Sequence, residues 1–313
     1  PTPREILTRA AFENAIKVLA ALGGSTNALV HLIAVARRAG VDLALEDFDT
    51  IGAKVPLLVD CKPSGANYME DFHGAGGLPV LLKELRRHLD TSTVGVTGRP
   101  MAELLAEVGP HAGTRPVVRT LDDPLGAPGA LAVLTGSLAP AGAVIKTSAA
   151  TPELLQHTGP AFVVDAGDDI SAILDDPDLD LTPDHVLVLR MAGPIAAGMP
   201  EAGALPIPAK LAREGVRDMV RVSDGRMSGT SYGTVVLHCD PEAAAGGPLA
   251  AVQNGDLIRL DVPARRIDLL VDEAELARRL AAFTPAPLPQ RGWRRLYAET
   301  VLPASEGADL SFL

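Results

Sequence analysis

The feature that most constrains the fold of this chain is a series of eight short apolar runs that follows residue 116. Turn-forming residues separate the runs, and helical spacing intervenes at Ile207–Glu214 and Glu273–Ala282. Many short strands in close succession are typical of sheets that close on themselves, so we expect a closed or partly closed β-barrel. The runs are Leu131–Leu134, Ala143–Lys146, Ala161–Val164, Val186–Leu189, Met219–Val222, Val235–His238, Leu257–Leu260 and Ile267–Val271.

The first third of the chain predicts helices instead. Apolar residues recur at helical spacing up to Leu19, Gly23–Gly24 is expected to end that helix, and a second helix should follow directly. The pattern changes near residues 109–116. The predicted fold class is therefore α/β plus β, with residues 1–115 as the trailing part of an α/β domain and residues 116–313 as a β-barrel-like domain.

The composition argues against several classes of protein. The net charge of -11 and the lack of a basic stripe make a nucleic-acid partner improbable. No apolar run approaches the roughly 18–20 residues that span a bilayer, so no membrane partner is expected. The two cysteines, Cys61 and Cys239, form neither a metal motif nor a disulfide framework and are expected to be core thiols. Low cysteine usage without a signal peptide predicts a cytoplasmic protein.

The segment Ser223–Thr230 follows a predicted strand and is rich in glycine and hydroxyl groups. A strand that leads into such a turn exposes backbone amides and a hydroxyl at one end of a sheet, where sites are commonly built. The segment differs from the G-x-S-x-G elbow of serine hydrolases, because Gly225 lies one position too far from Ser228. Serine hydrolysis through Ser228 and a purely structural tight turn are two further interpretations.

Two other turns carry candidate binding residues. Glu201 is flanked by proline and glycine, a stiff and exposed setting that suits either a hard-metal ligand or a solvent-facing turn residue. One carboxylate alone does not make a magnesium site. Ser25, Thr26 and Asn27 follow two glycines at a predicted helix start, where free amides and the helix dipole favour an anion such as a substrate carboxylate. A close turn between two helices would explain the same three residues.

Taken in order, these segments resemble the dihydroxy-acid and sugar-acid dehydratases, a family of [2Fe–2S] enzymes. Any one segment is weakly specific, whereas their order along essentially the whole chain is strongly specific. Met227–Thr234 and the tail Gly307–Leu313 are more similar to the pentonate (arabinonate- and xylonate-type) dehydratases than to the branched-chain amino-acid enzyme. The other matching segments are Leu7–Ala15, Ala21–Asn27, Asp71–Pro79, Leu138–Pro140, Gly142–Lys146, Gly198–Glu201, Ser223–Gly233, Pro241–Ala243 and Gly246–Leu249.

The resemblance implies a hydro-lyase that converts a 2,3-dihydroxy sugar acid into a 2-keto-3-deoxy acid. In the family, an iron of the [2Fe–2S] cluster takes the departing C3 hydroxyl, and Mg²⁺ holds the carboxylate side. The matching positions imply Ser228 as the base, Thr230 as a neighbouring positioning residue and Glu201 as one Mg²⁺ ligand. A serine hydroxyl is a feeble base in water, so its role demands a strong local positive field. The implied barrel is of the swivelling β/β/α type.

The chain departs from the family pattern in what it lacks. The three cluster cysteines and the other Mg²⁺ ligands would lie upstream of Pro1, so we expect a fragment that binds no cluster and is inactive alone. The complete enzyme is expected to be a homodimer or homotetramer that acts on a small-molecule substrate. The alternatives are a dihydroxy-acid dehydratase of branched-chain amino-acid synthesis and a non-catalytic ligand-binding or interaction module. His73, Lys146 and the loop Gly74–Gly77 receive no role.

Overall fold

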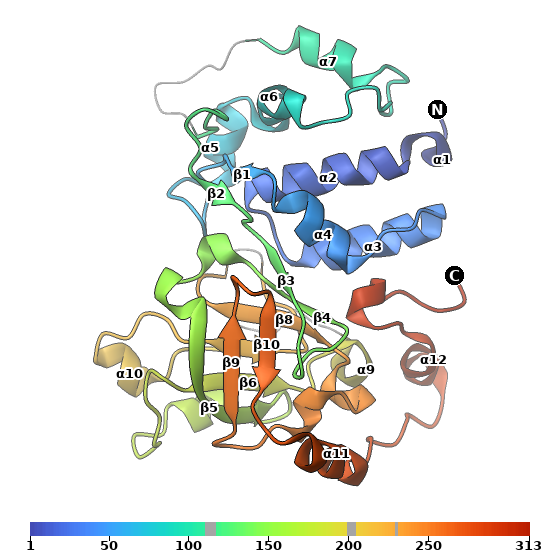
Figure 1. The fold of residues 1–313 in the computed structure, drawn as a ribbon. Helices are drawn as coiled ribbons and strands as arrows, with labels where there is room; N and C mark the ends of the chain where they lie inside the picture. Colours follow the sequence, from blue (N-terminus) through green and yellow to red (C-terminus); the bar gives the residue numbers. More distant parts are fainter. Residues whose placement is uncertain (110–116, 199–204, 229–230) are drawn as a thin grey trace. The chain divides into compact units, whose positions relative to one another are not determined.

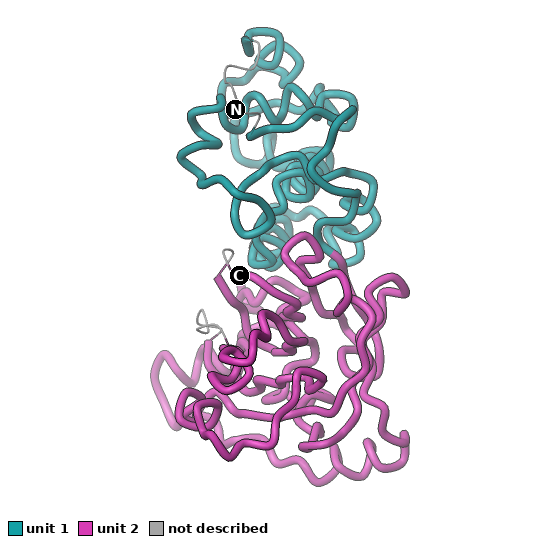
Figure 2. The backbone as a smooth tube through the Cα atoms, turned by 90° about the vertical axis from the view of Figure 1, so that its left-hand side faces the viewer, with its two compact units in different colours: residues 1–131 teal, residues 132–313 magenta. Residues whose placement is uncertain are grey.

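The chain forms two compact units, Pro1–Leu131 and Ala132–Leu313 (Figure 2). Each unit has a hydrophobic core of its own. The domain boundary that the sequence predicts near residue 115 falls among residues 110–116, which lie outside the described part. The computed structural model describes residues 1–109, 117–198, 205–228 and 231–313.

The first unit consists mainly of α-helices, with a short antiparallel strand pair, β1 and β2. Helix α2 ends at Gly23 and α3 ends at Gly40; both glycines adopt the left-handed conformation, with φ of 59° and 74°, that closes a helix without strain. The helix end predicted at Gly23–Gly24 is thereby confirmed. The elements are α1 (Pro3–Ile6), α2 (Arg9–Leu22), α3 (Asn27–Ala39), α4 (Leu45–Gly52), β1 (Pro56–Leu57), α5 (Met69–Gly74), α6 (Gly77–Glu84), α7 (Met101–Glu107) and β2 (Gly126–Pro128) (Figure 1).

In the described part of the second unit, eight strands form one mixed sheet with the order β10-β9-β5-β6-β7-β8-β4-β3 (Figure 1). Strands β5, β6, β7 and β8 run parallel, and the other neighbours are antiparallel. Each strand overlaps one of the predicted apolar runs, which confirms that part of the prediction. The strands are β3 (Ala132–Leu134), β4 (Gly142–Ile145), β5 (Gln156–Asp165), β6 (Val186–Arg190), β7 (Arg221–Ser223), β8 (Val235–Asp240), β9 (Leu257–Asp261) and β10 (Arg266–Leu269).

The two edges of this sheet meet. Thr135, which follows β3, forms a parallel bridge with Arg266 of β10. The Thr135 N–H donates to the Arg265 carbonyl at 3.0 Å, and the Ile267 N–H donates to the Thr135 carbonyl at 3.1 Å. The sheet is therefore nearly closed. The predicted combination of an α/β region with a barrel-like β region is confirmed at this level.

Side chains alternate between the inside and the outside of the nearly closed sheet. Val186 and Val188 of β6 pack in the apolar interior, whereas Leu187 and Leu189 point outward into a second cluster that α8 and α10 cover. Both helices predicted within this unit are present, as α10 and α11. No helix in the described part of the chain combines the length and hydropathy of a membrane span. The outer helices are α8 (Ile170–Leu174), α9 (Pro194–Ala197), α10 (Ala209–Arg213), α11 (Glu273–Ala282) and α12 (Gly292–Thr300).

Candidate functional site

The loop between β7 and β8 carries Ser228, the base that the resemblance implies. Met227, the preceding residue, packs with Val235 and Leu237 of β8. These two side chains point outward, because Val236 between them packs in the barrel interior. The loop therefore crosses the outer face of β8, and Ser228 is exposed there.

The other predicted site residues are distributed differently. Thr230 and Glu201 lie outside the described residues, so their roles stay predictions. Ser25 and Thr26 lie between α2 and α3 in the first unit, and Asn27 is the first residue of α3; its N–H donates to the Ser25 hydroxyl oxygen at 3.2 Å. Thr26 is buried. Their part in substrate binding also stays a prediction.

Asp224 fixes the start of the Ser228 loop. Its fully buried carboxylate accepts the backbone N–H groups of Met191 at 3.2 Å, Ala192 at 2.9 Å and Ala243 at 2.9 Å. Met191 and Ala192 follow β6 and Ala243 follows β8, so one side chain joins three segments at the carboxyl ends of parallel strands. Burial raises the pKa of Asp224, although the three N–H groups oppose the shift.

Glu242 fixes the segment that leads toward Glu201. One oxygen, Oε1, accepts the backbone N–H groups of Ile195 at 2.9 Å and Ala196 at 3.0 Å, in the short helix α9. Gly193 makes room for this carboxylate, because a Cβ there would lie 2.2 Å from Oε2 of Glu242. Burial raises the pKa of Glu242 to about 7 against these hydrogen bonds.

Arg221 fixes the far end of the Ser228 loop. Its guanidinium forms an ion pair of 3.0 Å with Asp218 and donates to the Tyr232 carbonyl at 3.0 Å. Asp218 in turn accepts the N–H and the hydroxyl of Thr234, each at 2.8 Å. Buried charged groups thus anchor both ends of the loop, and Ser228 is exposed between them.

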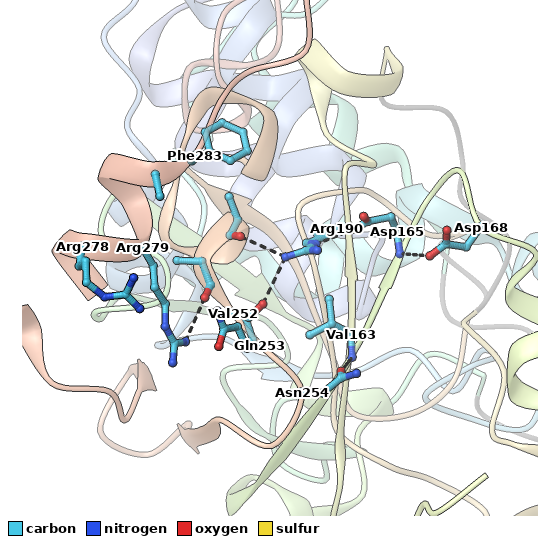
Figure 3. A pocket seen from close by; sticks show the side chains of 13 residues that line it. Val163, Asp165, Asp168, Arg190, Val252, Gln253, Asn254, Arg278, Arg279 and Phe283 are labelled. Atoms are coloured by element: carbon cyan, nitrogen blue, oxygen red, sulfur yellow. Dashed lines mark hydrogen bonds and ion pairs between the residues drawn. The ribbon is translucent and has the colours of Figure 1, made fainter. Parts of the chain in front are cut away.

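A cavity of about 510 Å³ opens at the carboxyl ends of β5 and β6 (Figure 3). Arg190 on its wall donates to Asp165 at 2.5 Å and to the carbonyls of Ala250 at 3.0 Å and Val252 at 3.2 Å. Arg279, from α11, also forms ion pairs of its own. Because these charges already have partners, we assign the cavity no ligand.

The two cysteines do not fit an iron–sulfur cluster. Cys61 lies in the core of the first unit and Cys239 in the barrel interior, both as free thiols, which confirms their prediction as core residues. Burial raises the pKa of both thiols and so disfavours the thiolate that iron requires. Among the described residues, no three His, Cys, Asp or Glu side chains are grouped to hold a metal ion. The described residues therefore fit neither a [2Fe–2S] cluster nor a complete Mg²⁺ site.

Sequence reasoning missed the charged residues that anchor the site. Asp224 offered a usable signal, because it lies two residues after the predicted strand Met219–Val222 and precedes a glycine, a position typical of a carboxylate that binds backbone amides. Glu242 lies in Pro241–Ala243, one of the segments that resemble the family, but its neighbours in the sequence do not indicate a contact with α9. Asp218 lies three positions before Arg221, the first residue of β7, a spacing that could have suggested an ion pair.

Two family models together match most of the chain. The model described as "Dihydroxy-acid/6-phosphogluconate dehydratase N-terminal" matches residues 1–104. The model described as "Dihydroxy-acid/6-phosphogluconate dehydratase C-terminal" matches residues 116–308.

Individual relatives agree with this match. The 6-deoxy-6-sulfo-D-gluconate dehydratase of Pseudomonas putida is 48% identical over 316 residues, and the L-arabinonate dehydratase of Rhizobium leguminosarum bv. trifolii is 48% identical over 317 residues. Both alignments cover 99% of this chain and 54% of the relative. The dihydroxy-acid dehydratase of Acidothermus cellulolyticus is 46% identical over 314 residues, which is 98% of this chain and 54% of the relative. The chain spans about half the length of the relatives that it matches. On the strength of matches that extend through both of its parts, the chain belongs to the dihydroxy-acid/6-phosphogluconate dehydratase family.

Proposed function

We propose that this chain is part of a dehydratase that converts a 2,3-dihydroxy sugar acid into a 2-keto-3-deoxy acid. The observation that carries the proposal is the setting of Ser228, which is exposed on a loop with buried anchors at both ends, Asp224 at the start and Arg221 at the return. A fixed hydroxyl is what a catalytic base requires, because proton transfer needs defined geometry. Relatives named as sugar-acid dehydratases support this substrate class.

In the proposed reaction, Ser228 acts as an alkoxide and accepts the proton from C2 of the substrate. The C3 hydroxyl leaves with this same proton as one water molecule, which restores the alkoxide. The resulting enol tautomerises to the 2-keto acid, so the balance is the loss of water alone. We propose that Thr230 positions the substrate beside Ser228. Ser25, Thr26 and Asn27 are proposed to bind the substrate carboxylate through the start of α3.

Glu201 is proposed to contribute one Mg²⁺ ligand, on the resemblance of its turn to that of the family. The [2Fe–2S] cluster and the remaining Mg²⁺ ligands are proposed to come from polypeptide beyond this chain. No step of the reaction is assigned to them, because the described residues do not form either site.

We also propose the bounds of the two domains, the type of the barrel and the assembly of the complete enzyme. The division into residues 1–115 and 116–313 is supported by family models that match residues 1–104 and 116–308. A swivelling β/β/α type for the barrel is supported by its nearly closed mixed sheet with helices outside. The complete enzyme is proposed to be a cytoplasmic homodimer or homotetramer, and the net charge of -11 supports a small-molecule partner over a nucleic acid.

The substrate class is tested with the complete polypeptide that contains this chain, carrying its cofactors. It is assayed against pentonates, hexonates and 2,3-dihydroxyisovalerate, with 2-keto acid formation followed as the semicarbazone. Sugar acids are expected to react faster than 2,3-dihydroxyisovalerate. A reverse preference would favour the branched-chain alternative, and no keto acid from any substrate would refute the dehydratase.

The role of Ser228 is tested in the same enzyme with Ser228→Ala. Loss of the base should lower kcat by about 10³-fold or more while the visible absorption of the cluster is unchanged. Ser171→Ala is the control, because Ser171 is an exposed serine of α8 in the same unit. Normal turnover by Ser228→Ala would show that the base lies elsewhere.

A further inference from the structure

Lys146 is a buried lysine on the outer face of the barrel. It directly follows β4 and is extended, with φ of −90° and ψ of 92°, so the alternation of the strand continues to it. Ala143 and Ile145 pack in the interior, which places Lys146 on the opposite face, together with Val144. Only 9% of Lys146 is exposed.

The same outer face carries the Ser228 loop. The antiparallel register of β4 and β8, continued by one residue past Ile145, places Lys146 beside Val235. Val235 packs with Met227, the residue that precedes Ser228. The strand register and the packing of the loop therefore bring Lys146 and Ser228 to one region of the second unit.

The Lys146 ammonium group has no hydrogen bond or ion pair with the described residues. Burial alone lowers the pKa of Lys146 to about 8, so the amine is still mostly protonated at neutral pH. A buried charge without a partner costs stability. Such a cost is typical of a functional group, since a structural cation would be paired.

Among the residues that the structure describes, the elements around Lys146 bring it no compensating carboxylate. The residue beside Lys146 on β8 is the apolar Val235, and the outward residue of β3 nearest in register, Val133, pairs with Val144 and is also apolar. In the described part of the Ser228 loop the charged side chains are Asp224 and Arg226, and the Asp224 carboxylate is already bound by three backbone N–H groups. The positive charge of Lys146 is therefore available to a negative charge that forms in this region.

We propose that Lys146 is a positioning residue of the reaction centre, whose ammonium group stabilises the negative charge of an ionised Ser228. The inference rests on the proposed role of Ser228 as the base. A serine oxygen can act as a base only in a positive electrostatic field. A cation held in a poorly solvated place supplies such a field without reorganisation of its surroundings during the reaction. This chain then contributes part of the field itself, in addition to any metal.

The test uses Lys146→Met and Lys146→Arg in the complete enzyme with its cofactors. Lys146→Met is expected to lower kcat by about 10²-fold and to change KM by less than about threefold, because the lost interaction acts only on charge in the transition state. Lys146→Arg, which keeps the charge, should recover at least about tenfold of the lost kcat. Lys210→Met, at an exposed lysine of α10, is the matched control and should behave as wild type.

Several outcomes would overturn the proposal. A raised KM with unchanged kcat would show that Lys146 binds the substrate instead of acting on Ser228. Unchanged kcat and KM in Lys146→Met would mean that Lys146 is not part of the reaction centre. The same conclusion would follow if the kcat of Lys146→Arg were as low as that of Lys146→Met. If the wild-type enzyme forms no keto acid from any substrate, the proposed dehydratase function itself is refuted. If the wild-type enzyme is active and Lys146→Met has the same kcat, only the role of Lys146 is refuted.

Thermal unfolding separates this role from a structural one. Removal of an unpaired buried charge should leave the melting temperature of Lys146→Met at pH 7 equal to or above that of wild type, although activity falls. A lower melting temperature would indicate a structural cation and contradict the proposal. A ¹³Cε-lysine titration, assigned with Lys146→Met, should give a midpoint near 8 for Lys146, and a midpoint above 10 would show that the amine is not buried.

Discussion

The carboxylate of Asp218 lies 3.0 Å from the guanidinium of Arg221, and the two side chains are only 3% and 7% exposed. Arg221→Met should lower the free energy of unfolding by about 3 kcal/mol, because it leaves the buried Asp218 without its counter-ion. It also removes the donor to the Tyr232 carbonyl at the end of the Ser228 loop. Urea unfolding followed by circular dichroism measures the loss.

The control for Arg221→Met is Arg259→Met. Arg259 pairs with Asp268 at 3.1 Å, but its side chain is 50% exposed and Asp268 keeps Arg266 as a second partner. An exposed pair of this kind contributes little, so the loss should stay below about 1 kcal/mol. Equal losses in the two variants would mean that burial does not set the strength of the Asp218–Arg221 pair.

Asp224→Asn tests the carboxylate that joins the ends of three strand segments. Oδ1 accepts the N–H of Ala192, and Oδ2 accepts those of Met191 and Ala243. However the asparagine amide is turned, its NH₂ group faces at least one of these donors, and that donor is left buried without an acceptor. We expect a loss of about 2–3 kcal/mol in the free energy of unfolding.

Asp240→Asn is the matched control for Asp224→Asn. Asp240 is also buried, and its Oδ2 accepts the Ser305 N–H at 3.0 Å, which an asparagine oxygen can still accept. The loss should be below about 1 kcal/mol. Faster amide hydrogen exchange at Ala192 should accompany Asp224→Asn alone, and unchanged exchange there would argue against the proposed anchor.

The eight strands of the second unit were predictable because buried apolar residues recur along each of them. Where a strand is only partly buried, its apolar run is shorter than the strand. Strand β5 runs over Gln156–Asp165, whereas the predicted apolar run starts at Ala161. Its first half pairs with β9 and carries exposed polar side chains such as Gln156. Helix α4 was missed for a similar reason, since only Leu45, Phe48 and Gly52 are buried in it.

The site was less predictable than the fold, because its contacts join residues far apart in the sequence. Asp224 meets the N–H of Ala192 across 32 positions, and Glu242 meets that of Ile195 across 47. Local spacing does not encode such pairs; they exist because parallel strands bring their carboxyl ends to one edge. The predicted strand and its glycine-rich turn placed Ser228 on a loop, but only the structure shows how that loop is anchored.

Gly225→Ala tests the close approach of the Ser228 loop to the segment after β6. A Cβ at Gly225 would lie 2.7 Å from the Cβ of Ala192 and 3.2 Å from its carbonyl oxygen. The segments would have to separate, so we expect a loss of about 1–3 kcal/mol and a lower melting temperature. Gly167→Ala, where a Cβ meets nothing within 4 Å, should be neutral, and a similar loss there would remove the steric explanation.

Glu242 makes the stability of the second unit depend on pH. Burial raises its pKa from 4.5 to about 7, so between these values the folded protein keeps a proton that the unfolded chain has lost. The contribution of Glu242 to stability is therefore highest at about pH 4.5 and below, and it falls as the pH rises through about 7. Glu242→Gln keeps an oxygen for the N–H groups of Ile195 and Ala196 but cannot ionise.

The free energy of unfolding of Glu242→Gln should match that of wild type near pH 4 and exceed it by roughly 1–3 kcal/mol at pH 8. Glu275→Gln is the control with the opposite sign, because hydrogen bonds from Arg278 and Arg279 lower the pKa of Glu275 to about 2. That variant should be less stable than wild type at neutral pH, and the difference should shrink as the pH falls toward 2. Parallel profiles for Glu242→Gln and wild type between pH 4 and 8 would mean that the buried carboxyl ionises without cost, which its burial beside Asp224 and Asp240 argues against.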